Sequence, residues 1–174
     1  SWALPNRELE ITPDYLDQLI VSYKDAGYNF VCIDSLVGRL NKMRWPWQKK
    51  LVNISFDDGF RDIYEYAYPI FKKYDIPFTI YLTSSFPEGK ADIWWIQLEQ
   101  LIANNTTLLV QGEECRCETD EEKNQLFNDL MQRIYHNSDT PSKVFAQWFA
   151  DYQMESDMAK IALAWDELAE MLAS

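Results

Sequence analysis

Two adjacent carboxylates, Asp57 and Asp58, are the residues of this sequence best placed to do chemistry. They follow the apolar run 51–56 and precede Gly59, so they stand where a buried strand passes into a turn. One carboxylate can hold a divalent metal that activates water, and its neighbour can take the proton from that water. Asp-Gly by itself is a common turn signal. The surrounding sequence is therefore needed to distinguish a catalytic or metal-binding site from a purely structural turn.

The other side chains that could bind a metal are less favourably arranged. Cys115 and Cys117 are only two positions apart, which is too close for a usual zinc site, and Cys32 lies in an apolar run. His136 is the only histidine in the sequence and falls on a predicted helix, where a packing or surface role is usual. An odd number of cysteines favours reduced thiols and a cytoplasmic location.

A parallel β-α-β unit is predicted around the two aspartates. The runs 51–56 and 77–83 are apolar and suit buried strands, whereas 62–74 has a helical apolar face that Pro69 should interrupt. Two strands joined by a helix of this length pair in parallel, and ligands gather at the carboxyl ends of such strands. This places the aspartates at a ligand-binding edge.

The segment before this unit also has recognisable starts and stops. Thr12 is predicted to cap a helix with Pro13 at its first position. A buried strand is predicted at 29–33, and Asp34 is expected to cap a short helix that runs through Leu40. The fold class is therefore α/β.

The second half of the sequence is predicted to be mostly helical. Helices are expected at 93–103, from a cap at Thr119 to about His136, and around 144–152, with one strand at 107–110. The acidic run 113–122 is expected to be a solvated surface.

Composition limits the classes of partner. A net charge of −12 opposes binding to phosphate backbones, so nucleic acid is excluded as a partner. No apolar run approaches the roughly 18 residues that a membrane span needs, and the first residues lack the apolar stretch of a signal peptide. Both observations also favour the cytoplasm.

Several motifs together resemble the polysaccharide deacetylase family, the NodB-like domains of carbohydrate esterase family 4. The first motif of that family is similar to Val52-Asn53-Ile54-Ser55-Phe56-Asp57-Asp58-Gly59-Phe60-Arg61-Asp62. Further similarity extends over Ala67-Tyr68-Pro69-Ile70-Phe71, Ile76-Pro77-Phe78-Thr79-Ile80-Tyr81-Leu82, Trp94-Trp95 and Trp165-Asp166-Glu167-Leu168.

The resemblance implies a fold, a reaction and roles for residues. The fold would be an incomplete, distorted (β/α) barrel, and the reaction would be hydrolysis of N-acetyl groups on a polysaccharide or oligosaccharide. Asp57 would be the general base and Asp58 a ligand of a divalent metal, usually zinc. Gly59, Phe60 and the pair Trp94-Trp95 would lie near the substrate.

The division into parts follows from the same resemblance. We predict the N-terminal part of the barrel at 1–103, a mostly helical insertion at 104–160, and a helix leading back to the barrel at 161–174.

The family's His-x-x-x-His metal motif is expected shortly after the Trp165 segment, where this sequence ends. We therefore expect a truncated fragment that binds no metal and is inactive alone, and that self-associates through exposed barrel edges. One alternative is a non-catalytic carbohydrate-binding or assembly module that uses Trp94 and Trp95. A third possibility is another metal hydrolase that acts on a small amide.

Overall fold

A computed structural model describes residues 10–40, 50–153 and 157–173. The chain divides into two compact units. The unit formed by Ile11–Ala91 and Asp157–Ser174 contains both aspartates and is here called the motif unit. The unit formed mainly by Asp92–Ser156 interrupts it in sequence and is called the inserted unit. Each unit has its own hydrophobic core.

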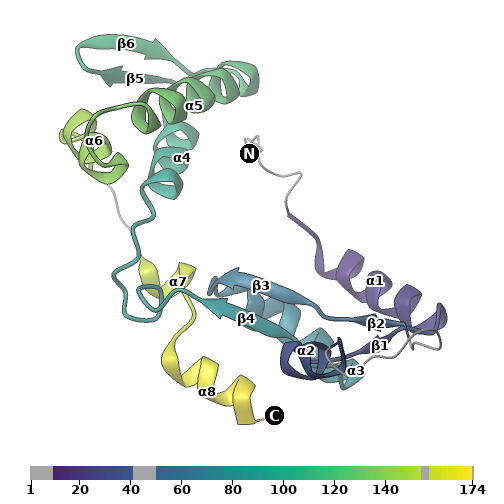
Figure 1. Cartoon of the computed structure of the whole chain (residues 1–174). Coiled ribbons are helices and arrows are strands. Elements are labelled where there is room, and N and C mark those ends of the chain that lie inside the picture. Colours follow the sequence, from purple (N-terminus) through teal and green to yellow (C-terminus); the bar gives the residue numbers. More distant parts are fainter. Residues whose placement is uncertain (1–9, 41–49, 154–156, 174) are drawn as a thin grey trace. The chain divides into compact units, whose positions relative to one another are not determined.

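The motif unit combines short parallel strand pairs with helices (Figure 1). Its elements in chain order are α1 (Pro13–Asp25), β1 (Asn29–Phe30), α2 (Ile33–Leu40), β2 (Leu51–Val52), β3 (Ser55–Asp58), the π-helical segment η2 (Ile63–Ala67), α3 (Tyr68–Tyr74), β4 (Thr79–Leu82), α7 (Met158–Ile161) and α8 (Trp165–Ala173).

The predicted start of the first helix is confirmed. The Thr12 hydroxyl accepts a hydrogen bond from the backbone N–H of Tyr15 at 3.2 Å, and Pro13 occupies the first turn. The prediction for the next segment was wrong in its bounds. The strand predicted at 29–33 is shorter, since β1 spans only Asn29–Phe30 and α2 already begins at Ile33. Asp34 was expected to cap this helix, but it lies in the first helical turn.

The predicted strand at 51–56 is two strands that pair with different partners. β2 pairs in parallel with β1, whereas β3 pairs in parallel with β4. Asn53 lies at the break, and its side-chain amide donates to the carbonyl of Val31 at 2.8 Å and to the hydroxyl of Thr79 at 3.3 Å. One polar side chain within the run 51–56 therefore links the two strand pairs.

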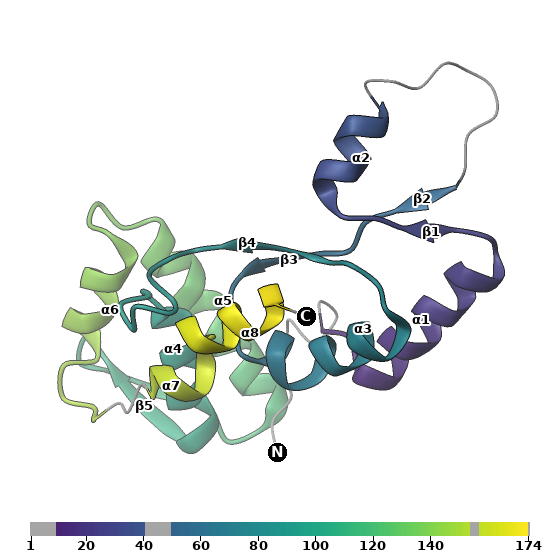
Figure 2. The same ribbon diagram turned by 90° about the horizontal axis from the view of Figure 1, so that it is seen from below.

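The helix between β3 and β4 is irregular, as its proline predicts. η2 is wound as a π-helix, and α3 begins at Tyr68 with Pro69 in its first turn. Proline has no N–H to donate to the preceding turn, so the hydrogen-bond pattern has to change near this position. α1 packs against both η2 and α3 (Figure 2).

The core of the motif unit gathers side chains from α1, η2, α3 and the segment before α8. Its buried members are Leu16, Ile20, Ile63, Ala67, Phe71 and Leu163. The β3–β4 pair is placed against this core by Phe56 and Ile80, which pack on it from neighbouring positions of the two strands.

The inserted unit is an α+β arrangement with a single hairpin. Its elements are α4 (Trp94–Asn104), β5 (Thr107–Val110), β6 (Glu113–Arg116), α5 (Asp120–Tyr135) and α6 (Pro141–Trp148). The predicted cap at Thr119 is confirmed as a capping box with Glu122. The acidic run is mostly exposed, as predicted, and its first four residues form β6, which pairs antiparallel with β5.

The mixed α/β fold class is confirmed. Within residues 10–40, 50–153 and 157–173 the strands form separate two-stranded sheets, and the barrel stays a prediction. The division between units falls at 92 and 156, whereas the predicted insertion was 104–160, so α4 groups with the hairpin and α5. Of the described helices, none combines the length and apolar character needed to cross a membrane.

Candidate functional site

Asp57 and Asp58 occupy the last two positions of β3, at its carboxyl end, as the sequence predicts. They pair in register with Tyr81 and Leu82 of the parallel strand β4. Asp57 is exposed and Asp58 is half-buried. Two rigid strands therefore present adjacent carboxylates at the edge where parallel sheets hold their ligands.

The backbone turns sharply at Asp58. Its φ is +65°, in the left-handed region, and Gly59 follows with φ +111°. A left-handed conformation costs an L-residue roughly 1–2 kcal/mol, although aspartate tolerates it better than most. Such outliers gather at functional sites, where the surrounding structure has to hold them in place.

Hydrogen bonds from the end of β4 hold this turn. The backbone N–H of Thr83 donates to the carbonyl of Asp58 at 2.9 Å, and the Thr83 hydroxyl donates to its Oδ1 at 3.2 Å. The N–H of Gly59 donates to the carbonyl of Asp57 at 2.8 Å. The Asp58 carboxylate is thus fixed through both its backbone and its side chain.

Gly59 is required by space as well as by conformation. It is buried, and a Cβ added there would lie 2.6 Å from Cδ1 of Leu82. Real carbon atoms do not approach that closely, so a larger residue would force the Leu82 side chain or the turn to shift.

The chain that returns from the inserted unit is fastened to the same turn. Phe60 forms an isolated antiparallel bridge with Ala162, and the N–H of Leu163 donates to the carbonyl of Gly59 at 2.9 Å. The Phe60 ring makes an edge contact with Phe86, with ring centroids 4.9 Å apart. Phe60 therefore has a packing role beside the aspartates, and its predicted place near a substrate stays a prediction.

Arg61 extends this attachment. Its guanidinium forms ion pairs with Glu65 at 3.3 Å and with Glu167 at 2.9 Å, and it also donates to the carbonyl of Ala159. Glu167 in turn accepts from the N–H of Ala164 at 2.9 Å, which fixes the start of α8. Arg61 was not predicted as a functional residue, and only its place in the motif at 52–62 distinguishes it in the sequence.

A second link joins η2 to α8. The hydroxyl of Tyr64 donates to Oε2 of Glu170 at 2.6 Å. That hydrogen bond, with partial desolvation and the nearby negative charges, raises the pKa of Tyr64 to about 12. The hydroxyl therefore stays protonated at neutral pH and keeps α8 attached to η2.

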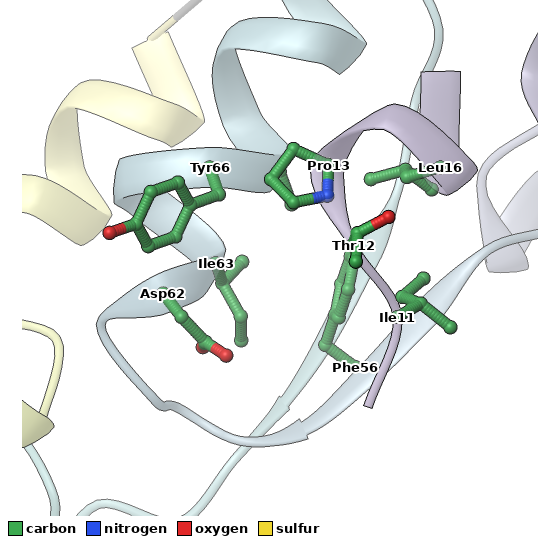
Figure 3. A pocket seen from close by; sticks show the side chains of 9 residues that line it. Ile11, Thr12, Pro13, Leu16, Phe56, Asp62, Ile63 and Tyr66 are labelled. Atoms are coloured by element: carbon green, nitrogen blue, oxygen red, sulfur yellow. The ribbon is translucent and has the colours of Figure 1, made fainter. Parts of the chain in front are cut away.

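A small pocket lies between the start of α1, β3 and η2 (Figure 3). Its volume is about 110 Å³, and it is lined mostly by apolar side chains, among them Ile11, Leu16 and Ile63. Neither Asp57 nor Asp58 lines it. At this volume and with this mostly apolar lining, the pocket does not suit a sugar ring.

The aspartates do not form a complete metal site by themselves. In the part of the chain that the structure describes, no group of three histidine, cysteine, aspartate or glutamate side chains could hold a metal ion. Zinc sites normally use at least three protein ligands. Asp57 and Asp58 therefore fit part of a zinc site but not all of it.

The remaining candidates lie in the inserted unit and have structural surroundings. Trp94 is only 4% exposed and packs against Tyr135 and Phe145, so its ring belongs to a core and has no surface for a sugar. Trp95 is half-buried against the same core. His136 ends α5, exposed, with its Nδ1 2.8 Å from a carbonyl oxygen of its own helix.

The cysteines do not form a site either. Cys32, Cys115 and Cys117 are free thiols. Cys117 is buried, and desolvation raises the pKa of its thiol.

Comparisons with known proteins point to one family. The sequence model of the family described as polysaccharide deacetylase matches residues 46–137, which is more than half of the chain and includes both aspartates. No curated protein matches the chain.

A solved structure, the Streptococcus pyogenes deacetylase PplD in complex with acetate, is similar over 57% of this chain with 30% identity and a TM-score of 0.42. The match covers 46% of that protein, so the chain spans less than half of its length. By the match to the family model, the chain belongs to the polysaccharide deacetylase family.

Proposed function

We propose that this chain supplies the first catalytic motif of a metal-dependent deacetylase that hydrolyses N-acetyl groups on glycan sugars. Asp57 would act as the general base, and Asp58 would be a ligand of a divalent metal, with zinc as the first candidate. The observation that carries this proposal is the turn at the end of β3, where Asp58 adopts a left-handed conformation held by Thr83.

The geometry suits these two roles. Asp57 is exposed and therefore free to take a proton from water, which a general base needs. Asp58 is half-buried, and one carboxylate oxygen already accepts a hydrogen bond from Thr83, as ligating carboxylates commonly do. When bound, the metal would polarise the acetamide carbonyl and lower the pKa of the attacking water.

The described residues provide only part of this centre, so the proposal includes a dependence on further ligands. We propose that the 174 residues alone bind no metal and do not turn over substrate. Acetate release and zinc binding test that point when they are measured on this chain and on a protein in which further ligands complete the centre, here called the complete protein. Turnover by the chain alone would remove the proposal of an incomplete centre.

The test of the residue roles uses the complete protein and an N-acetylated chitooligosaccharide. Asp57→Asn and Asp58→Asn should each lower acetate release by about 10²-fold or more. Asp58→Asn should also weaken zinc binding, because an amide is a poorer ligand than a carboxylate. Full activity in either variant would contradict the assigned roles.

Asp75→Asn is a matched control. Asp75 also has a left-handed backbone, with φ +52°, and lies in the same unit at the end of α3. Asparagine tolerates this conformation as well as aspartate does, so this variant changes the charge without straining the backbone. It should keep both activity and zinc binding.

The arrangement of parts is a further element of the proposal. We propose that the motif unit is a portion of a distorted (β/α) barrel, and that the inserted unit, which includes α4, is an insertion into it. The parallel pairing of β3 with β4 and the intervening helix support a β/α repeat.

An open apolar groove supports the proposal that the chain self-associates. The groove has a volume of about 740 Å³ and is formed by β4 and α8, with Ile80, Leu82, Trp165 and Leu168 among its lining. Leu172 also lines it and is 90% exposed. Light scattering of wild type and Leu172→Lys tests the idea, since a monomeric wild type would contradict it.

A further inference from the structure

The inserted unit has a groove of a different character at the end of α4. It is lined by the carboxamide side chains of Gln97, Gln100, Asn104, Asn105 and Gln153, together with Tyr152. Its volume is about 500 Å³, within the range of roughly 300–1,000 Å³ that small-molecule sites occupy. In a chain that carries 16 basic and 28 acidic residues, this lining contains no charged side chain.

The hydrogen-bonding groups of the groove are largely unused. In the described parts of the chain, the side chains of Gln97, Gln100, Asn104 and Gln153 make no hydrogen bond. Each carboxamide offers two donors and an acceptor. The groove therefore concentrates donors and acceptors that are free to exchange water for a ligand.

Two of the residues that line the groove, Tyr152 and Asn105, are held in place. The Tyr152 hydroxyl accepts the N–H of Leu109 at 2.7 Å, which leaves its own proton free to donate, and its ring packs on Phe149. The Asn105 side chain donates to the carbonyl of Leu101 at 2.7 Å. Lys123 fixes the adjoining backbone by donating to the carbonyl of Asn105 at 3.1 Å. Such preorganisation is what distinguishes a binding groove from a mobile polar surface.

From this juxtaposition we infer that the groove binds a neutral oligosaccharide that carries N-acetyl groups. Carboxamides supply dipoles and no net charge, so they suit a ligand with many hydroxyl and amide groups and no ionised one. The choice of a glycan rests on the proposed function. The buried ring of Trp94 does not contribute to this surface.

The test is calorimetric titration of the whole chain with tri-N-acetylchitotriose in the presence of a metal chelator. Wild type should bind, and a Gln97→Ala/Gln100→Ala double variant should bind at least about tenfold more weakly, because two hydrogen-bonding groups are lost. Alanine is the best helix former, so both changes should leave α4 folded. In wild type, the side-chain amide resonances of Gln97, Gln100 and Asn104 should shift during the titration.

Two controls separate this inference from the proposed deacetylation. Gln147→Ala removes an exposed glutamine of α6 outside the groove and should bind like wild type. Asp58→Asn should also bind like wild type here, although it should abolish turnover in the complete protein. Sugar binding that is equal in wild type and the double variant, or absent from wild type, would overturn the inference whatever the outcome for turnover. Displacement of the sugar by a neutral polyglycine peptide would overturn the assignment to a glycan.

Discussion

Thr83 is bonded to Asp58 through both its backbone N–H, at 2.9 Å from the Asp58 carbonyl, and its hydroxyl, at 3.2 Å from Oδ1. The backbone bond continues the parallel pairing of β3 and β4 by one residue. The hydroxyl bond orients a carboxylate whose backbone is already in a left-handed conformation. The end of β4 therefore determines where the Asp58 carboxylate points.

Replacing Thr83 by valine tests this orientation. Valine keeps the shape and the backbone bond but removes the hydroxyl, so Asp58 loses its side-chain partner. In the complete protein we expect zinc affinity and kcat/KM to fall by about tenfold or more, as for other residues that orient metal ligands. Thr83→Ser restores the hydroxyl and should recover most of both values. Equal losses in the valine and serine variants would point to packing instead of orientation.

Gly59→Ala should destabilise the motif unit by about 2–3 kcal/mol, because it combines a left-handed strain with the 2.6 Å approach to Leu82. Gly89→Ala is the matched control. Gly89 also has positive φ, at +67°, but a Cβ there would meet nothing within 4 Å. It should therefore cost only about 1 kcal/mol in the free energy of unfolding measured with urea. Similar costs at the two positions would contradict the role of Leu82.

The sequence was informative where local signals determine structure. The caps at Thr12 and Thr119 involve only residues within one helical turn, and both were placed correctly. The two aspartates at the end of β3 followed from an apolar run that ends in Asp-Gly. The split between β2 and β3 did not, because it depends on Asn53 reaching Val31 in a segment distant in sequence.

The surroundings of the candidate site were also hard to predict, because they depend on contacts between residues that are distant in sequence. The contacts of Gly59 with Leu163 and of Arg61 with Glu167 join residues about a hundred positions apart, and nothing in the local pattern indicates them. The burial of Trp94 agrees with the more usual packing role of a tryptophan, although a place near the substrate was also predicted from the resemblance.

Lys123 should contribute to the stability of the inserted unit through a buried cap. It is 7% exposed, and its ammonium donates to the carbonyls of Ile102, Ala103 and Asn105 at 2.7, 2.8 and 3.1 Å. Lys123→Met keeps the apolar stem but leaves these carbonyls at the end of α4 without their donor. We expect a loss of about 2 kcal/mol in the free energy of unfolding. Lys143→Met, at an exposed position of α6, should change it by less than about 0.5 kcal/mol.

The ion pair between Asp17 and Lys73 predicts a dependence on pH. The two groups are 2.7 Å apart and join α1 to α3. The hydrogen bond with Lys73 lowers the pKa of Asp17 below its ordinary value of 3.8, and the same bond raises the pKa of Lys73 above 10.5. The ion pair therefore stabilises the folded state between the pKa of Asp17 and the pKa of Lys73. It is lost as pH falls through the lowered pKa of Asp17 or rises through the raised pKa of Lys73.

At pH 7, the Asp17→Asn variant should accordingly unfold at a lower urea concentration than wild type. The difference between the two urea midpoints should shrink as the pH is lowered below 3.8, because wild type then loses the charge of Asp17 as well. Asp75→Asn, which removes a carboxylate at the end of α3, serves as the control and should show no such change in the difference. If the difference between the urea midpoints of wild type and Asp17→Asn stays constant from neutral to acid pH, the ion pair with Lys73 is not the cause of the lost stability.

The ion pair between Arg61 and Glu167 should be worth more than an ordinary surface pair. Glu167 is only 12% exposed and Arg61 34%, so water screens their attraction less than it screens the attraction between Lys90 and Glu88, which are 74% and 43% exposed. In a double-mutant cycle with Arg61→Gln and Glu167→Gln we expect a coupling energy of about 1 kcal/mol in urea unfolding. The cycle with Lys90→Gln and Glu88→Gln should give a coupling near zero. Equal couplings would mean that charge adds nothing at Glu167, and that Arg61 acts mainly through its bond to the carbonyl of Ala159 in α7.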